Sequence, residues 1–463
     1  MTNHGVKNSL EFRKKTISSV WNDHGDGEEH ASHASGARTI VFHPNLTHNN
    51  QISNYYRNAD DRLAEAVSLS AALELDIVMA EVISLNKIRP ATYLGKGKLE
   101  ELSAYIHGQN IELVVADCEL SPGQQRNLER ELKVKVIDRT GLILEIFGER
   151  AQTKEGVMQV ELAHLSYQKS RLVRSWTHLE RQRGGFGFMG GPGESQIESD
   201  RRQIDERIGK IKKQLDSVIR TRELHRDSRR KVPFPIIAMV GYTNAGKSTL
   251  FNKLTRANVM AEDLLFATLD PTMRNVDMPN GNKAIFSDTV GFISDLPTHL
   301  VAAFRATLEE VTEADIILHI RDISHPETEA QKKDVEDILK SLDVFDNDAQ
   351  NIFEVWNKID LLDSEQRDVV ENAATRQDNV ALVSAVSGEG CDALLQQLDR
   401  VLAKDKKTYT LTFSHGKGAD IALFYKYGEV LSRTDSEEGT EITVRLDQAA
   451  IGQLSKMGKL DED

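Results

Sequence analysis

Residues Gly241 to Thr249 read G-Y-T-N-A-G-K-S-T. The apolar run from Ile236 to Val240 before them has the character of a strand, and the run from Leu250 to Leu254 after them is typical of a helix. A glycine-rich loop with the spacing G-x-x-x-x-G-K-S between a strand and a helix is the pattern of a phosphate-binding loop. The pattern predicts a nucleotide-binding α/β domain in the middle of the chain.

The chemistry of such a loop assigns a role to each part of the stretch. Its backbone N–H groups surround phosphates, and the N-terminus of the following helix adds a favourable partial charge. We expect Lys247 to neutralise the outer phosphates and Ser248 to ligate Mg²⁺. The predicted nucleotide contacts in this stretch are Gly241, Tyr242, Thr243, Asn244, Ala245, Gly246, Lys247, Ser248 and Thr249.

The motif D-T-V-G from Asp288 to Gly291 follows a short apolar run. We expect Asp288 to hold the Mg²⁺ shell and the Gly291 N–H to sense a γ-phosphate. The next residue is Phe292, at a position where small GTPases commonly carry a glutamine that orients water. Because phenylalanine cannot do this, no catalytic side chain is certain and intrinsic hydrolysis is expected to be slow. K⁺ held near Asn244, in place of an arginine finger, is one hypothesis for completing the site.

The segment F-A-T-L-D-P-T from Phe266 to Thr272 lies between the two motifs. A threonine in such a segment closes over Mg²⁺ when γ-phosphate is present and is released after hydrolysis. We expect Thr268 in this role as the third Mg²⁺ ligand, with Thr272 as the alternative. Phe266 is included among the predicted nucleotide contacts.

Two later motifs predict the choice of base. N-K-I-D from Asn357 to Asp360, with Lys358 inside it, follows an apolar strand. The Asp360 carboxylate can accept from both N1 and N2 of guanine, a donor pattern that adenine lacks. Ser384 and Ala385 would offer a backbone N–H to the guanine O6. A lone N-K-x-D is a weak signal, but four elements in this order predict GTP.

Length and composition set the wider bounds. A chain of 463 residues with 28% charged and 39% hydrophobic residues fits an ordinary globular protein of about three domains. The sequence contains neither a signal segment nor a run of about 20 apolar residues, so we expect a cytoplasmic protein, with peripheral membrane association as an alternative. The two cysteines, Cys118 and Cys391, predict no disulfide framework.

The flanking regions predict further domains. From Thr39 to about Phe147, strand and helix patterns alternate, which indicates a parallel sheet flanked by helices. The turn from Gly95 to Lys98 could bind an anion or simply cap a helix. After about Lys404, alternation at Thr408 to Phe413 and Glu441 to Leu446 around a helix near Ala422 to Leu431 predicts a small C-terminal α/β domain. The predicted divisions are a disordered tail 1–38, an α/β domain 39–155, a helical hairpin 156–231, a GTPase domain 232–404 and a C-terminal domain 405–463.

Two long helices are predicted between the first sheet and the phosphate-binding loop. Apolar residues recur at three- and four-residue steps, as in the seam of an antiparallel hairpin. The seam positions are Leu162, Leu165, Leu172, Trp176 and Leu179 in the first helix, and Ile197, Ile204, Ile208, Ile211, Leu215 and Val218 in the second.

The loop between these helices and the charge beside it indicate an RNA partner. Residues Gly184 to Gly193 are mostly glycine, and their apolar members have no evident core to enter from the tip of a hairpin. Residues Arg201 to Lys231 hold 12 Lys or Arg against 5 Asp or Glu, within a chain whose formal net charge is -14. A solvated helix face is the plain alternative, yet basic helices beside an aromatic tip favour RNA. The predicted tip contacts are Gly184, Phe186, Phe188, Met189 and Gly193.

The chain resembles the HflX family of ribosome-associated GTPases over roughly Ala91 to Ser387. The segments that carry the resemblance are Y-L-G-K-G-K-L-E-E-L from Tyr93, V-I-D-R-T-G-L-I-L-E-I-F from Val136, G-G-P-G-E-S-Q-I-E-S-D-R-R from Gly190, G-Y-T-N-A-G-K-S-T-L, L-F-A-T-L-D-P-T and D-T-V-G-F-I. The tip departs from the family's usual G-G-I-G-x-R-G-P-G form, because it has more aromatic residues and lacks the arginine.

The resemblance implies the same order of α/β domain, helical hairpin, GTPase domain and C-terminal extension. It also implies binding to the large (50S) ribosomal subunit and its rRNA, with the hairpin tip near the peptidyl-transferase region. Further implications are splitting of stalled or idle ribosomes and GTP hydrolysis stimulated by the ribosome. ATP use by the N-terminal domain has been suggested for the family, but no second phosphate-binding loop is visible in the sequence. The expected state is a monomer with no DNA partner.

An alternative function is a GTP-switched RNA-binding factor in assembly of the large subunit. A metabolic or tRNA-modifying enzyme with a regulatory GTPase domain is disfavoured, since no additional catalytic set of Cys, His or carboxylates is evident.

Overall fold

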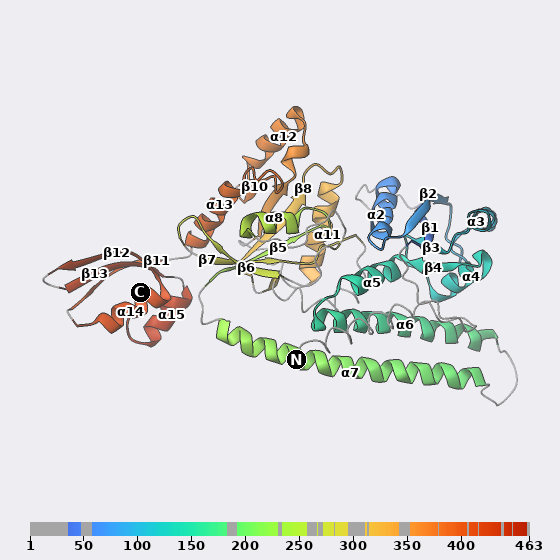
Figure 1. Cartoon of the computed structure of the whole chain (residues 1–463), viewed down its shortest axis with the longest axis horizontal. Helices are drawn as coiled ribbons and strands as arrows, with labels where there is room; N and C mark the ends of the chain where they lie inside the picture. The colour runs from blue at the N-terminus through green and yellow to red at the C-terminus, as the bar shows by residue number, and fades with distance from the viewer. Residues whose placement is uncertain are drawn as a thin grey trace.

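The structure is a computed structural model of the chain, in which three groups of strands and helices follow one another (Figure 1). It describes residues 36–47, 58–182, 192–229, 234–256, 266, 272–281, 283–294, 311–312, 314–341, 352–377, 379–404, 407–414, 416–436, 439–446 and 448–460. The predicted tip residues Gly184, Phe186, Phe188 and Met189 and the predicted Mg²⁺ ligand Thr268 lie outside these ranges, as does most of the predicted tail.

The first group is a parallel sheet of four strands in the order β2-β1-β3-β4. The strands are β1 (Arg38–Leu46), β2 (Asp76–Leu85), β3 (Leu113–Ala116) and β4 (Lys135–Asp138). The helices are α2 (Ala59–Ala71), α3 (Lys96–Gln109), α4 (Pro122–Leu132) and α5 (Arg139–Arg150). The parallel sheet confirms the predicted architecture of this region.

Helices cover both faces of this sheet, and alternate residues of its inner strands enter the cores on opposite sides. Ile40 and Phe42 of β1 belong to the core with α3 and α4, whereas Val41 belongs to the core with α2 and α5. Helix α5 follows β4 directly and was not predicted from the sequence. Asp138 caps it by accepting from the Gly141 N–H at 2.8 Å.

The second feature is the pair of long helices α6 (Lys154–Gln182) and α7 (Pro192–Arg229), which lie side by side in Figure 1. Five of the predicted seam residues meet in one apolar cluster with Met158: Leu162, Leu165, Ile211, Leu215 and Val218. Arg207 adds an ion pair, since its Nε lies 2.6 Å from Glu161 Oε1. The predicted hairpin is confirmed, although the side chains of Trp176, Leu179 and Ile197 lie outside the described part.

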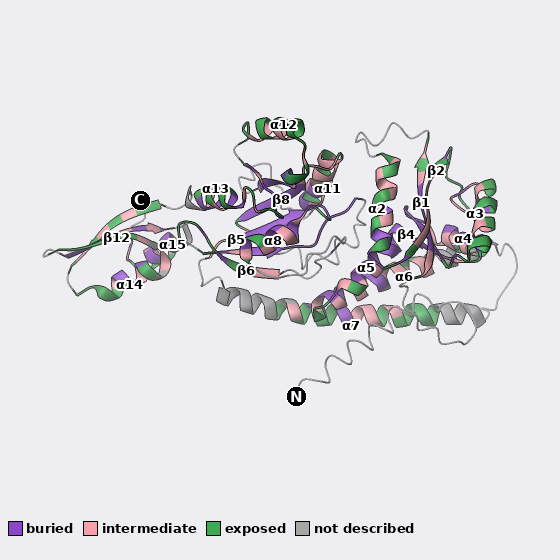
Figure 2. Cartoon of the chain, turned by 45° about the horizontal axis from the view of Figure 1, so that its top comes forward, coloured by how far each residue is buried: buried purple, intermediate pink, exposed green. Residues whose placement is uncertain are grey.

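The GTPase domain has a sheet of six strands in the order β10-β9-β8-β5-β7-β6, in which only β6 pairs antiparallel to its neighbour. The strands are β5 (Ile236–Gly241), β6 (Thr272–Asp277), β7 (Lys283–Asp288), β8 (Ile316–Asp322), β9 (Ile352–Asn357) and β10 (Val380–Leu382). The described helices are α8 (Lys247–Thr255), α11 (Thr328–Ser341), η1 (Ile359–Leu361), α12 (Ser364–Ala374) and α13 (Cys391–Lys404). The central strands β5 and β8 are buried (Figure 2).

The C-terminal part is an antiparallel sheet in the order β11-β13-β12 with two helices on it. Its elements are β11 (Lys407–Phe413), α14 (Gly418–Tyr427), β12 (Glu429–Ser436), β13 (Gly439–Leu446) and α15 (Gln448–Lys456). The predicted helix to Leu431 is wrong at its end, because β12 begins at Glu429. Gly428 lies so close to β13 that a Cβ there would stand 2.4 Å from Leu446 Cδ2.

The mixed α/β class, with a phosphate-loop domain between an N-terminal α/β domain with its hairpin and a small C-terminal domain, is confirmed. The residue numbers at which the domains divide stay a prediction. Among the described helices, none combines the length and the apolar character that a membrane span requires.

Candidate nucleotide-binding site

The phosphate-binding loop links β5 to α8, as its sequence predicts. Gly241 and Gly246 both have positive φ angles, of 155° and 89°. A Cβ on Gly241 would lie 2.2 Å from the Ile320 carbonyl oxygen, and one on Gly246 would lie 2.2 Å from Asn357 Nδ2. Both positions therefore require glycine, for conformation and for space.

Lys247 is buried, and its Nζ donates to the carbonyl oxygens of Tyr242 at 2.8 Å and Gly241 at 3.1 Å. Burial lowers the pKa of this lysine to about 8, while the charge of Asp288 opposes the shift. A phosphate beside the ammonium group would stabilise its charged form. Two carbonyl groups of the loop thus hold the Lys247 ammonium group beside the place where a phosphate would bind.

Two of the three predicted Mg²⁺ ligands lie together. The Ser248 hydroxyl donates to Asp288 Oδ2 at 2.7 Å, and Asp288 is fully buried at the end of β7. Hydroxyl and carboxylate oxygens are ligands that Mg²⁺ prefers. The donor set therefore fits the ion. The third ligand, Thr268, lies outside the described residues.

Thr243 supplies a further polar group to the loop. Its Oγ1 is buried and has no hydrogen-bond partner among the residues that the structure describes. Its backbone N–H donates to the Phe292 carbonyl at 2.7 Å. A buried hydroxyl in a phosphate-binding loop needs an acceptor or donor, and a phosphate oxygen would satisfy it.

Asn357 joins the phosphate loop to the segment that follows β10. Its Nδ2 donates to the Ala245 carbonyl at 2.8 Å, and its Oδ1 accepts from the Ala385 N–H at 3.0 Å. The Ala385 N–H, predicted to contact guanine O6, is thus engaged by Asn357 in this structure. Ser384, beside it, is fully buried. Asn357 therefore links two loops of the site through its side-chain amide, whether or not it also contacts the base.

Lys358 has a positive φ of 66°, and its Nζ lies 2.7 Å from Asp322 Oδ2. This ion pair fixes the loop that precedes η1. Asp360, within η1, is exposed, as a carboxylate that receives a base must be. Its contact with guanine stays a prediction.

Phe266 and Phe292 are both about 2% exposed. Phe292 belongs to the apolar core, which agrees with the expectation that it does not orient a water. Phe266 packs against Phe147 of α5, with ring centroids 4.6 Å apart and an edge-to-face angle of 76°. A direct contact of Phe266 with the nucleotide stays a prediction, whereas its contact with the N-terminal domain was not foreseen.

Sequence reasoning also missed the residues of the N-terminal domain that lie beside the loop. A cavity of about 180 Å³ lies beside the contact between α2 and the loop. Its lining includes Arg62, Glu65, Tyr242, Thr243, Asn244 and His325. No sequence motif connects α2 with the phosphate loop, since 177 positions separate Glu65 from Tyr242.

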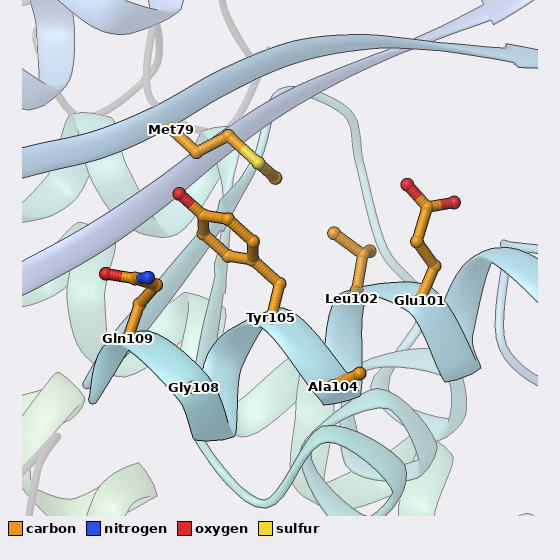
Figure 3. A pocket seen from close by; sticks show the side chains of 7 residues that line it. All are labelled: Met79, Glu101, Leu102, Ala104, Tyr105, Gly108 and Gln109. Carbon is orange, nitrogen blue, oxygen red and sulfur yellow. The ribbon is translucent and has the colours of Figure 1, made fainter.

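A second cavity, of about 380 Å³, lies between α3 and β2 (Figure 3). Met79 and Tyr105 face each other across it, and Glu101 is the charged residue in its lining. Lys98 of the Gly95 to Lys98 turn donates to Glu101 at 2.8 Å and to Glu81 at 2.6 Å. Because two carboxylates hold this ammonium group, and Gly95 is the N-cap of α3, the turn caps a helix.

The sheet is parallel except for β6, and the phosphate loop follows its inner strand β5. The loop lysine is buried, the Mg²⁺ donors adjoin it, and the N-K-x-D motif is tied to the loop through Asn357. Together these features define a P-loop GTPase.

Comparison with known proteins places the chain within that class. Residues 60–148 match the family described as the N-terminal region of a GTP-binding GTPase, and residues 150–229 match its middle region. Residues 236–358 match the family described as 50S ribosome-binding GTPase, and residues 368–463 match the HflX C-terminal domain.

Two similar proteins carry the name of this family. The GTPase HflX of Magnetococcus marinus is 52% identical over 399 residues, which are 86% of this chain and 91% of that protein. The GTPase HflX of Escherichia coli is 41% identical over 379 residues, 82% of this chain and 88% of that protein. The solved complex of SsGBP with GDP is 24% identical, with a TM-score of 0.46, and covers 79% of this chain and 99% of that one.

The chain belongs to the HflX family of GTPases. It binds GTP and hydrolyses it to GDP and phosphate.

Proposed function

We propose that the protein binds the large ribosomal subunit in its GTP-bound form and splits stalled or idle ribosomes, and that hydrolysis, stimulated by the ribosome, releases it. The observation that carries this proposal is the α6–α7 hairpin beside the GTPase domain. Helix α7 has 38 residues, so at about 1.5 Å per residue it extends over roughly 57 Å. A helix of this reach can insert its end between rRNA segments while the GTPase domain stays outside.

Charge and family support the same partner. The basic excess from Arg201 to Lys231 lies largely on α7, where Lys210, Lys212 and Lys213 are exposed. Exposed cations attract the phosphate backbone of RNA. The match of the GTPase domain to a family described as 50S ribosome-binding points to the large subunit. We place the protein's action in the cytoplasm, where that subunit works.

In this function the nucleotide acts as a switch. Mg²⁺ would be held by Ser248, Asp288 and Thr268, and it neutralises charge on the β- and γ-phosphates when bound. Because the Phe292 side chain is buried, a group from the partner, a monovalent cation or another residue of this chain must complete the hydrolytic site. K⁺ near Asn244 is our proposal for that cation. Equal GTPase rates in KCl and NaCl would show that K⁺ does not complete the hydrolytic site.

The experiment that tests the function is sucrose-gradient analysis of purified 70S ribosomes with the full chain and a nonhydrolysable GTP analogue. We expect the 70S peak to fall and the 30S and 50S peaks to grow, with no such change in GDP. Binding to precursor particles while 70S ribosomes stay intact would contradict splitting and favour an assembly factor.

A further inference from the structure

The loop from Ser384 to Gly390, called the base loop below, follows β10 and is predicted to contact guanine O6. Its backbone closes on itself. The Ser384 N–H donates to the Glu389 carbonyl at 2.9 Å, and the Gly388 N–H donates to the Ser384 carbonyl at 2.8 Å. Ser384 Oγ accepts from the Ser387 N–H, and Ser387 Oγ accepts from the Glu389 N–H, both at 3.2 Å. The base loop is therefore a compact turn.

Close packing anchors the two ends of this loop. Ser384 at its start is fully buried. Gly390 at its end has a positive φ of 76°, and a Cβ there would lie 2.0 Å from the Leu382 carbonyl oxygen. Val386, between these ends, is 75% exposed. Packing in the core therefore does not hold the turn between the two ends.

Lys253 of α8 supports this turn from one side. Its Nζ donates to the Ser387 carbonyl at 3.4 Å. A Cβ on Gly388 would stand 2.5 Å from Lys253 Cε and 2.9 Å from Lys253 Nζ, so the end of the lysine side chain lies directly against Gly388. Helix α8 begins at Lys247 of the phosphate loop. One helix thus connects the phosphate end of the site with the base loop.

Arg367 of α12 supports the same turn through a second contact. Its Nη2 donates to Glu389 Oε1, and its Nε donates to Glu371 Oε1 at 2.9 Å within α12. Glu389 is also the residue whose carbonyl accepts from the Ser384 N–H. Neither Lys253 nor Arg367 belongs to one of the nucleotide-binding motifs, so the sequence does not mark them.

The position of the base loop determines where the Ala385 N–H lies. This N–H donates to Asn357 Oδ1 at 3.0 Å. A guanine O6 would share this donor or displace Asn357 from it. Because a hydrogen bond weakens steeply as its angle departs from linearity, the predicted contact with O6 is sensitive to small shifts of the base loop.

We propose that Lys253 and Arg367 are positioning residues for the guanine base. They hold the base loop through two contacts before a nucleotide binds, so that the Ala385 N–H meets guanine O6 with little further ordering of the loop. The proposal rests on the predicted contact between Ala385 and O6. It concerns the purified chain and does not depend on the ribosomal partner.

The test measures the affinities of the full chain for GDP, 6-thio-GDP and IDP by competition with a fluorescent GDP. Sulfur at C6 is a poorer acceptor than oxygen, whereas IDP lacks the N2 amino group that Asp360 is predicted to bind. Lys253→Ala and Arg367→Gln should each lower the preference for GDP over 6-thio-GDP about two- to fivefold, the range for an exposed ion pair. The preference for GDP over IDP should not change, because Asp360 lies outside the base loop.

Three further variants separate positioning from general damage. Lys253→Arg keeps a cation beside the Ser387 carbonyl and should restore the preference of the unsubstituted chain. Glu389→Gln removes the partner of Arg367, so combining it with Arg367→Gln should lower the preference no more than the larger single change. Arg400→Gln is the matched control, since Arg400 is exposed and its Nε donates to the Gln396 carbonyl at 3.2 Å within α13.

An unchanged preference for GDP over 6-thio-GDP in both Lys253→Ala and Arg367→Gln would overturn the proposal. An equal fall in the preference over IDP, or the same fall in Arg400→Gln, would overturn it too, because either result would indicate general damage to the site. An unsubstituted chain that does not prefer GDP to 6-thio-GDP would show that the base loop does not read O6. If one of the two main variants does not fold, the other decides the outcome.

Discussion

Lys247 is the residue whose charge depends most directly on the nucleotide. Its pKa is about 8 in the structure because it is buried, and a bound phosphate should raise it. Below pH 8 the lysine is already charged, whereas between about pH 8 and its ordinary pKa near 10.4 it gains a proton on binding. We therefore expect GDP binding at pH 8.5 to take up most of one proton, and affinity to fall as pH rises through 8.

Calorimetry in buffers of different ionisation enthalpy measures this proton uptake. The same titration at pH 6.8 is the control, since little uptake by Lys247 is expected there. Uptake that is equal at both pH values would show that the lysine is charged before binding.

Two histidines should make the fold sensitive to acid. Burial lowers the pKa of His164 to about 4 and that of His319 to about 3; at His319, Glu354 opposes the shift and Arg321 adds to it. The unfolded chain takes up these protons near pH 6.5, so stability falls as pH drops below that value. Each histidine should contribute a slope of roughly 1.4 kcal/mol per pH unit.

Urea denaturation between pH 6.5 and 5 tests this slope. His164→Gln or His319→Gln should flatten the fall in unfolding free energy by about that amount, while His107→Gln, at an exposed position, should leave it unchanged. Curves with the same slope in all four proteins would exclude the two buried histidines as the cause.

At the residue scale, motifs reveal some contacts and conceal others. The spacing G-x-x-x-x-G-K-S predicts Gly246, and the structure adds that Asn357 Nδ2 would stand 2.2 Å from a Cβ there. Nothing in the sequence indicates that Glu65 meets Ser294, because 229 positions separate them and each carries an ordinary polar side chain. Such pairs arise from the arrangement of domains, which a local pattern does not encode.

Among the elements, the α6–α7 hairpin depends on a small apolar cluster. Ile211 is 1% exposed and packs with Met158 and Leu215. Ile211→Ala should destabilise the hairpin by about 2–4 kcal/mol, because it leaves a cavity. Hydrogen exchange should then quicken in α6 and α7 but not in β5, whereas Lys213→Ala, at an exposed site on α7, should alter neither. Equal acceleration in β5 would indicate that the hairpin and the GTPase domain unfold together.

Deletion of the hairpin tip should separate two functions of the chain, GTP binding and action on ribosomes. Deleting residues 184–193 should spare GTP binding, because no described contact of the phosphate loop comes from α6 or α7, and should impair action on ribosomes. Fluorescent GDP binding and 70S gradients measure the two properties on the same preparation. Normal splitting of 70S ribosomes by the chain that lacks residues 184–193 would show that the tip is not needed for splitting.

Hydrophobic periodicity predicts a helix when one face of it is buried and the other is exposed. It gives no signal when the helix is buried on all sides. The hairpin seam is visible as three- and four-residue steps, and five seam residues meet as expected. Helix α5 was missed because nearly all of its residues from Arg139 to Phe147 are buried, so no polar face marks a helical period. The end of α14 was placed too late because Gly428 stops the helix through its contact with β13, which lies further along the chain.

For the whole molecule, the order of domains follows from the sequence, but their contacts do not. Glu65 of α2 accepts from the Tyr242 hydroxyl of the phosphate loop, Arg139 of α5 donates to Ser294, and Phe147 of α5 packs on Phe266. Side chains of two domains therefore surround the nucleotide-binding loop.

The central claim is tested most directly by co-sedimentation of the full chain with purified 50S subunits in a nonhydrolysable GTP analogue and in GDP. We expect the protein to pellet with 50S subunits in the analogue and to remain largely in the supernatant in GDP. Equal pelleting in both nucleotides, or none in either, would contradict a GTP-switched factor of the large subunit.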